Sequence, residues 1–197
     1  MMKTGVIILA AGNSSRLGSP KQLLGFRGAT LLETAIHAAA QTSFTPIVLV
    51  LGAYANEILG AVKNLTINYT VNDNWTEGMS SSIKVGLEKM IKLEPDTENV
   101  IITVSDQPYI TDEIFNLLLA EQMISKKNII ACSYAETIGT PALFNKQYFD
   151  ELMRLEDGAG AKHLITKYKD DVATIPFELG YIDIDTETDY KNLTEPQ

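Results

Sequence analysis

The chain is poor in the residues that usually carry disulfide, redox or metal chemistry. Its 197 residues include one cysteine, one tryptophan and two histidines. Cys132 has no partner for an internal disulfide, and its place in the apolar run Ile129–Cys132 predicts a buried side chain rather than a nucleophile. His37 and His163 have no second histidine or cysteine at ligand spacing. These shortages exclude a disulfide scaffold and disfavour a zinc centre.

Long hydrophobic runs and an excess of positive charge are also missing. No apolar run approaches the roughly 18 residues that span a membrane. The segment Val6–Ala11 is too short for a signal-peptide core, so we expect a cytoplasmic protein that does not bind membranes. The formal net charge of −9 disfavours broad binding of nucleic acid or anionic membranes. A small anionic substrate remains compatible with it, because a local cationic pocket is sufficient.

Three familiar motifs are absent. Gly12 and Gly18 do not have the spacing of a P-loop, and no Lys-Ser or Lys-Thr pair follows them. The dinucleotide fingerprint G-x-G-x-x-G does not occur. Neither does G-x-S-x-G, and no Ser/His/Asp set stands out. Kinase, ATPase, NAD-dependent dehydrogenase and serine hydrolase functions therefore lose support.

What the chain does have is an alternation of short apolar runs with helix-like stretches. An apolar fraction of 45% and a charged fraction of 21% are typical of a soluble globular protein. Val- and Ile-rich runs that are apolar on both faces are typical of a parallel sheet covered on both sides. We predict strands at Gly5–Leu9, Ile47–Leu51, Ile67–Val71, Val100–Val104, Ile129–Cys132, Ala142–Phe144, Ala173–Ile175 and Ile182–Ile184.

Helices are predicted between these strands. Thr30 and Glu33 are typical of a capping box, which would open a helix ending near Ala40. Thr111 is expected to cap a later helix, with acidic residues in the first turn. Together with this helix, 111–126, further helices are predicted at 54–63, 80–92, 146–155 and 160–168. Without linkers or repeats, the pattern predicts an α/β fold with a mostly parallel sheet in one domain, 1–197.

The loop after the first strand is a candidate phosphate cradle. It is rich in small and hydroxyl residues, and it carries Arg16 and Lys21. Small residues let backbone N–H groups approach phosphate oxygens, and the two cations offset their charge. The alternative is an ordinary turn between a strand and a helix.

Carboxylates follow two other apolar runs. Asp106 comes just after the run Val100–Val104, where it would reach the crevice at the carboxyl ends of the strands and could hold Mg²⁺ against phosphate. It could equally be a turn residue, since Asp and Pro both favour turns. Alternation places Asp183 and Asp185 on one side of the last predicted strand, either as a solvated edge or as further metal ligands.

Three further segments each allow two interpretations. Ser80, Ser81 and Ser82 open a predicted helix, and they could cap it, with Ser80 as the cap, or contact a ligand. The loop Asp157–Lys162 has two glycines and a lysine, which suit a phosphate contact or a plain loop. Gly139-Thr140-Pro141 is most simply the start of a strand. Trp75 is expected to pack, although its place just before Gly78 allows a role near the pocket.

Together these loops resemble the MobA-like nucleotidyltransferases, in particular their molybdenum cofactor cytidylyltransferase branch. They follow the family order almost to the end of the chain. The matching segments are Leu9-Ala10-Ala11-Gly12-x-Ser14-x-Arg16-x-Gly18-x-x-Lys21, Gly78–Ser82, Asp106-Gln107-Pro108, Gly139–Phe144, Asp157–Lys162 and Asp183–Thr186. The resemblance implies a Rossmann-like three-layer fold. It also implies Mg²⁺-dependent transfer of a nucleotidyl group from an NTP to a phosphate-bearing acceptor, with release of pyrophosphate.

The resemblance also implies roles for individual residues. In this family Ala-Ala-Gly in the first loop goes with CTP and Ala-Gly-Gly with GTP, so Ala10-Ala11-Gly12 favours CTP. Arg16, Lys21 and Asp106 would be catalytic, and Asp106 would hold Mg²⁺ with Asp185 or Asp183. The nucleotide would be bound by Leu9, Ala10, Ala11, Gly12, Ser14, Arg16, Lys21, Ser80, Ser81 and Ser82, and the acceptor by Gly139, Thr140, Pro141, Gly158 and Lys162.

The acceptor is less constrained than the nucleotide. The implied acceptor is molybdopterin cofactor, with a molybdoenzyme as a further partner. However, Asp157–Gly160 and Thr140 depart from the usual family pattern in loops expected on the acceptor side. A sugar phosphate or another phosphate acceptor therefore stays open, as does a non-catalytic protein that binds the cofactor and delivers it to a molybdoenzyme.

Overall fold

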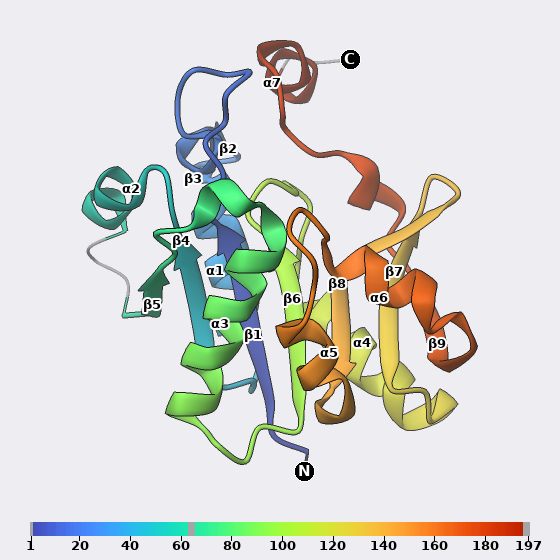
Figure 1. Cartoon of the computed structure of the whole chain (residues 1–197). Coiled ribbons are helices and arrows are strands. Elements are labelled where there is room, and N and C mark those ends of the chain that lie inside the picture. Colours follow the sequence, from blue (N-terminus) through green and yellow to red (C-terminus); the bar gives the residue numbers. More distant parts are fainter. Residues whose placement is uncertain (1, 63–65, 195–197) are drawn as a thin grey trace.

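A computed structural model describes residues 2–62 and 66–194, and its centre is a mixed sheet (Figure 1). The seven strands of this sheet have the order β5-β4-β1-β6-β8-β7-β9. They are β1 (Thr4–Ala10), β4 (Ile47–Leu51), β5 (Asn68–Val71), β6 (Asn99–Val104), β7 (Ile129–Tyr134), β8 (Thr137–Asn145) and β9 (Val172–Pro176). Only β8 runs antiparallel to its neighbours, β6 and β7. The prediction of an α/β fold with a mostly parallel sheet is confirmed.

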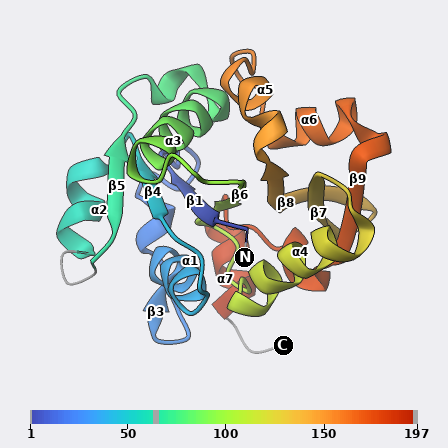
Figure 2. The ribbon, with the colours of Figure 1, turned by 90° about the horizontal axis from the view of Figure 1, so that it is seen from below.

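Helices cover both faces of the sheet (Figure 2). Along β1, Val6 and Ile8 join one buried core while Ile7 and Leu9 join the other, because successive side chains of a strand point to opposite faces. The first core is covered by α1 (Leu31–Ala40), α2 (Ala55–Ala61) and α4 (Asp112–Ser125). The second is covered by α3 (Met79–Leu93), α5 (Phe149–Met153) and α6 (Ala161–Lys167). Burial on two faces explains why the sequence predicts these strands well.

The ends of the helices match the sequence only in part. The capping box is confirmed: the Glu33 N–H donates to Thr30 Oγ1 at 3.1 Å, and the Thr30 N–H donates to the Glu33 carboxylate at 2.8 Å. Thr111 precedes α4 as predicted, but its side chain makes no capping hydrogen bond. The prediction of Ser80 as a cap was wrong. Gly78 takes that place, because its φ of +96° lets the chain turn sharply into α3.

Two predicted helices are shorter than expected. The helix predicted at 54–63 ends at Ala61, and residue 63 lies outside the described residues. The helix predicted at 146–155 is a 3₁₀ turn, Lys146–Tyr148, followed by the short α5. A small antiparallel hairpin, β2 (Gly25–Phe26) with β3 (Ala29–Thr30), was not predicted.

The segment after β9 differs most from the prediction. Ile182–Ile184 is not a strand, although the Ile184 N–H donates to the Asp106 carbonyl in the loop after β6 at 3.2 Å. Ile184 is completely buried, and this burial explains why the segment is apolar although it does not pair in the sheet. The segment leads to an unpredicted helix, α7 (Glu187–Thr194), which lies beyond the carboxyl ends of β1 and β6 in Figure 1.

This topology brings the loops after β1 and β6 together. The two strands are parallel neighbours with Leu9 opposite Val104, and the Ser105 N–H donates to the Leu9 carbonyl at 3.2 Å. Ala10 and Asp106 therefore leave the sheet at the same edge. Among the described helices, none combines the length and the apolar character that crossing a membrane requires.

Candidate active site

The loop after β1 is a compact turn that returns Lys21 to the edge of the sheet. Ser14 has a left-handed backbone with φ of 47°, and its carbonyl accepts hydrogen bonds from the N–H groups of Leu17 and Gly18. Its hydroxyl oxygen accepts from the Lys21 N–H at 3.1 Å. Ser14, which the resemblance assigns to nucleotide binding, thus shapes the loop that presents Lys21.

Gln22 fixes the start of the same loop from inside. Its side-chain amide donates to the carbonyls of Ala10 at 3.1 Å and Gly12 at 3.2 Å, and the residue is buried. With both carbonyls occupied, the backbone of Ala10–Gly12 is held in one conformation. Gln22 was not predicted from the sequence, where its only signal is its position beside Lys21.

Lys21 joins two carboxylates that are remote in the sequence. Its ammonium nitrogen lies 2.5 Å from Asp106 Oδ2 and 2.7 Å from Asp185 Oδ1. Arg16 binds the other oxygen of Asp185 at 2.6 Å, and its side chain is mostly exposed. Lys21, Asp106 and Asp185, all predicted site residues, therefore form one charged cluster. Arg16 lies at the solvent side of this cluster.

The charges in this cluster shift the pKa values of Lys21 and Asp185, and they also affect the pKa of Asp183. Burial disfavours the Lys21 ammonium, but the charge of Asp106 and the hydrogen bonds to both carboxylates outweigh it, so the pKa of Lys21 is raised. The hydrogen bond from Lys21 lowers the pKa of Asp185. Burial, followed by the charges of Asp106 and Asp185, raises the pKa of Asp183. Lys21 and Asp185 therefore remain charged at neutral pH.

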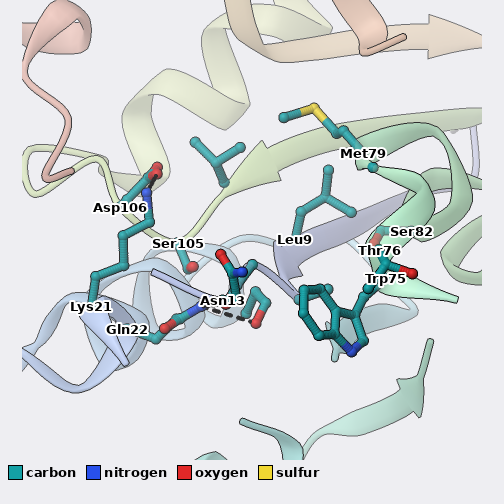
Figure 3. Close-up of a pocket in the computed structure, with 15 residues that line it drawn as sticks. Leu9, Asn13, Lys21, Gln22, Trp75, Thr76, Met79, Ser82, Ser105 and Asp106 are labelled. Carbon is teal, nitrogen blue, oxygen red and sulfur yellow. Dashed lines mark hydrogen bonds and ion pairs between the residues drawn. The ribbon is translucent and has the colours of Figure 1, made fainter. Parts of the chain in front are cut away.

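The cluster borders a cavity of about 400 Å³ at the carboxyl edge of the sheet (Figure 3). Lys21 and Asp106 lie at one side of it, and Trp75, Met79 and Ser82 lie at the other. Its lining residues are Leu9, Ala10, Ala11, Gly12, Asn13, Lys21, Gln22, Trp75, Thr76, Gly78, Met79, Ser82, Val104, Ser105 and Asp106. One cavity thus has a charged side and a side rich in apolar atoms.

Of the three serines at the start of α3, only Ser82 lines the cavity. Ser81 is engaged by its surroundings: its hydroxyl accepts from Asn72 Nδ2 at 2.8 Å and donates to the Gly78 carbonyl at 2.8 Å. Ser80 is fully buried, and its hydroxyl has no partner among the described residues. Ser80 is thus buried away from the cavity and Ser81 closes the turn before α3, so nucleotide binding by these two serines stays a prediction.

None of the five residues predicted to bind the acceptor lines the cavity. Gly139 and Pro141 are buried within β8, and the Thr140 carbonyl accepts hydrogen bonds from Gln107 and Tyr134. Gly158 donates its N–H to the Glu77 carbonyl at 3.0 Å. The exposed Lys162 ammonium donates to Thr137 Oγ1 at 2.7 Å. These contacts show structural roles, and binding of the acceptor by these residues stays a prediction.

The predicted metal ligands do not all converge. Within residues 2–62 and 66–194, no group of three or more His, Cys, Asp or Glu side chains is placed to hold a metal. Asp106 and Asp185 share Lys21, whereas Asp183 lines a separate hollow with Tyr109 and Tyr181. Between the two candidates for the second carboxylate, this arrangement favours Asp185.

Comparison with known proteins covers most of the chain. A model of the MobA-like NTP transferase domain matches residues 6–172. A nicotine blue oxidoreductase from Paenarthrobacter nicotinovorans is 36% identical over 107 residues, which are 53% of this chain and 50% of that protein. A molybdenum cofactor cytidylyltransferase from Escherichia coli K12 is 34% identical over 111 residues, 55% of this chain and 54% of that protein. The matched regions span about half the length of these curated relatives.

A solved structure extends the similarity over the whole fold. Rv0371c from Mycobacterium tuberculosis H37Rv, determined in complex with manganese, is 27% identical with a TM-score of 0.80, and the match covers 100% of both chains. The family match includes the loop after β1, Lys21 and Asp106, and it ends at the start of β9, before Asp185. The chain therefore belongs to the MobA-like NTP transferase family.

Proposed function

We propose that this protein transfers a cytidylyl group from CTP to a terminal phosphate of molybdopterin cofactor, with Mg²⁺, and releases pyrophosphate. The observation that carries the proposal is the position of Lys21. It is held between Asp106 and Asp185 at the edge of a cavity whose far side is rich in apolar atoms. A nucleotide has the same division, because its triphosphate is charged and the flat faces of its base are apolar.

The charged side suits a triphosphate. Lys21 and Arg16 supply two cations, and Gly12 has open space around its Cα, which allows close approach of a ligand to the backbone. The Lys21 side chain is mostly buried, so its charge acts in a medium where electrostatic interactions are stronger than in water. Phosphate oxygens would compete with Asp106 and Asp185 for the Lys21 ammonium.

The residues present also suit a magnesium ion. Asp106 Oδ1 is buried without a hydrogen-bond partner among the described residues, although a carboxylate oxygen in that position normally has one. Magnesium is commonly held by one or two carboxylates together with substrate phosphates, and Asp106 with Asp185 provides such a pair. When bound there, the ion would neutralise phosphate charge. The manganese in the complex of Rv0371c is a divalent ion of the same kind.

Positioning and charge neutralisation then account for the chemistry. An acceptor phosphate oxygen attacks the α-phosphorus, the bond from that phosphorus to the β-phosphate oxygen breaks, and pyrophosphate leaves. The acceptor phosphate is already ionised at neutral pH, so no strong base is required. Lys21 stabilises negative charge as it moves onto the leaving group, and Arg16 assists from the solvent side.

The choice of CTP and of the acceptor has separate support. The residues Ala10-Ala11-Gly12 line the cavity, and the resemblance links this triplet with CTP. The Escherichia coli relative carries the name of a molybdenum cofactor cytidylyltransferase, which supports the acceptor. The other curated relative is named a nicotine blue oxidoreductase, a name that points to no phosphate acceptor.

Pyrophosphate release tests the proposal. Purified protein is incubated with Mg²⁺ and CTP, GTP or ATP in turn, with molybdopterin cofactor or a sugar phosphate as the acceptor. We expect pyrophosphate with CTP in preference to the other nucleotides. Preference for GTP would contradict the cytidylyl assignment, release only with sugar phosphates would contradict the acceptor, and tight cofactor binding without release would indicate a delivery protein.

A further inference from the structure

Asn72, Ser81 and Ser82 form a buried network beside the cavity. Asn72 comes directly after β5, and its N–H donates to the Leu51 carbonyl at 2.8 Å, so the sheet fixes its backbone. The side chain is almost completely buried. Its Oδ1 accepts a hydrogen bond from the Asn74 N–H at 3.0 Å. Because a backbone N–H can only donate, this contact determines which end of the Asn72 amide is the oxygen.

Both protons of the Asn72 amide are then directed at serines. Asn72 Nδ2 lies 2.8 Å from Ser81 Oγ and 2.9 Å from Ser82 Oγ. The Ser81 hydroxyl directs its own proton at the carbonyls of Gly78 at 2.8 Å and Asn74 at 3.0 Å. Ser81 is therefore satisfied as both acceptor and donor.

Ser82 is different, because only its acceptor side is used. Its oxygen accepts from Asn72, and none of the residues in 2–62 and 66–194 accepts a hydrogen bond from its hydroxyl. Ser82 is buried yet lines the cavity, on the same side as Trp75 and Met79 in Figure 3. With an oxygen that already accepts, the hydroxyl is left with a proton to donate, and a bound ligand is the available acceptor.

We infer that Asn72 is a positioning residue that makes the Ser82 hydroxyl a fixed hydrogen-bond donor toward the nucleobase. The inference rests on the proposed function, which places the base at this side of the cavity. A fixed donor favours a base edge built from acceptors. The pairing edge of cytosine has two adjacent acceptors, N3 and O2, whereas that of guanine has one acceptor, O6, beside two N–H donors. The polarity of one hydroxyl would thus contribute to selection of CTP.

Three variants test this inference. Ser82→Ala removes the donor. Ser133→Ala is the matched control, because Ser133 is a partly buried serine of β7 that donates to the Ile175 carbonyl and lies outside the cavity lining. Asn72→Asp keeps the acceptor for Asn74 and replaces the amide donors with oxygen, so the Ser82 proton turns toward residue 72. Binding of CTP, GTP and inorganic triphosphate is measured by calorimetry with Mg²⁺, and circular dichroism checks that each variant is folded.

One neutral hydrogen bond corresponds to a change of roughly 3- to 10-fold in affinity. We expect Ser82→Ala to weaken CTP binding by about this factor and to leave inorganic triphosphate unaffected, with Ser133→Ala equal to the wild type. Asn72→Asp should lower the ratio of CTP to GTP affinity. If Asn72→Asp does not fold, the two alanine variants still decide the question.

Several results would overturn the inference. Unchanged CTP binding by Ser82→Ala would do so, as would equal losses in Ser82→Ala and Ser133→Ala, or a loss that also affects inorganic triphosphate. A wild-type protein that binds no nucleotide would remove the proposed function together with the inference. A wild type that binds CTP, beside a Ser82→Ala variant that binds it equally well, would remove the inference alone.

Discussion

At the scale of single residues, the site depends on one lysine held by two acids. Lys21 lies between Asp106 and Asp185, and its side chain is mostly shielded from solvent. Its ammonium is fixed by hydrogen bonds to both carboxylates, so in the proposed reaction it would need little reorganisation as phosphate charge develops. Arg16, which is mostly exposed and binds only Asp185, is less constrained.

The variant Lys21→Ala should therefore lose turnover and retain its fold. Removal of a group that stabilises charge in the transition state costs on the order of 10²–10³ in rate. Pyrophosphate release under saturating CTP measures the loss, and Lys167→Ala is the control, because Lys167 is also paired with a carboxylate, Glu151, but does not line the cavity. Near wild-type turnover in Lys21→Ala would show that Lys21 is not catalytic.

The sequence indicated part of this site and not the rest. Lys21 and Asp106 were predicted because each follows a strongly apolar strand, and parallel neighbours end at one edge. Gln22 and Asn72 were missed because polar residues after a strand are also typical of ordinary turns. Their roles depend on the atoms that they contact in the folded protein, and no local sequence pattern indicates these contacts.

At the scale of elements, the placement of α3 on the sheet decides where Ser82 and Met79 lie. Gly86 is the contact point. A Cβ atom at this position would come within 2.8 Å of the Cγ2 methyl groups of both Ile7 and Val50. These methyls belong to β-branched side chains with little rotational freedom, so they cannot yield easily. The glycine lets the helix approach β1 and β4 closely.

Two glycine-to-alanine variants should have opposite effects on stability. Gly86→Ala overpacks the contact between α3 and the sheet, which costs about 1–3 kcal/mol and outweighs the better helix propensity of alanine. Gly60 lies on α2, and a Cβ at this position would meet open space, so Gly60→Ala should raise the free energy of unfolding by about 0.5–1 kcal/mol. Urea denaturation of both proteins checks the pair. A Gly86→Ala variant as stable as Gly60→Ala would contradict the close packing.

The elements themselves were predicted with uneven success for a physical reason. The central strands carry apolar side chains on both faces, a pattern that is typical of strands buried within a parallel sheet. Ile182–Ile184 has the same local character, yet it crosses the strand ends instead of pairing beside them. Helix α7 has no buried residue, so it lacks the apolar face by which a helix is predicted from sequence.

At the scale of the whole molecule, the single cysteine reports on the integrity of the sheet. Cys132 lies in β7 with no exposed surface, and burial raises the pKa of its thiol to about 12. The prediction that this cysteine is buried is confirmed. A thiol with such a pKa is almost wholly protonated at neutral pH, and only the thiolate reacts rapidly.

Modification of Cys132 should therefore require opening of the sheet. In mildly alkaline buffer we expect a disulfide reagent such as Ellman's to react very slowly with the native protein and rapidly in denaturing urea. The rate at intermediate urea should follow the unfolding transition observed by circular dichroism. Fast stoichiometric labelling of the native protein would mean that β7 is accessible without unfolding.

The contact between Lys21 and Asp185 joins residues from opposite parts of the chain, 164 positions apart. The seven strands of the central sheet all lie before Asp185 in the chain. A cut between β9 and Asp185 would therefore leave every one of these strands on one fragment and place one of the two carboxylates that hold Lys21 on the other. The charge cluster thus depends on an unbroken chain at a point where the pairing of the sheet does not.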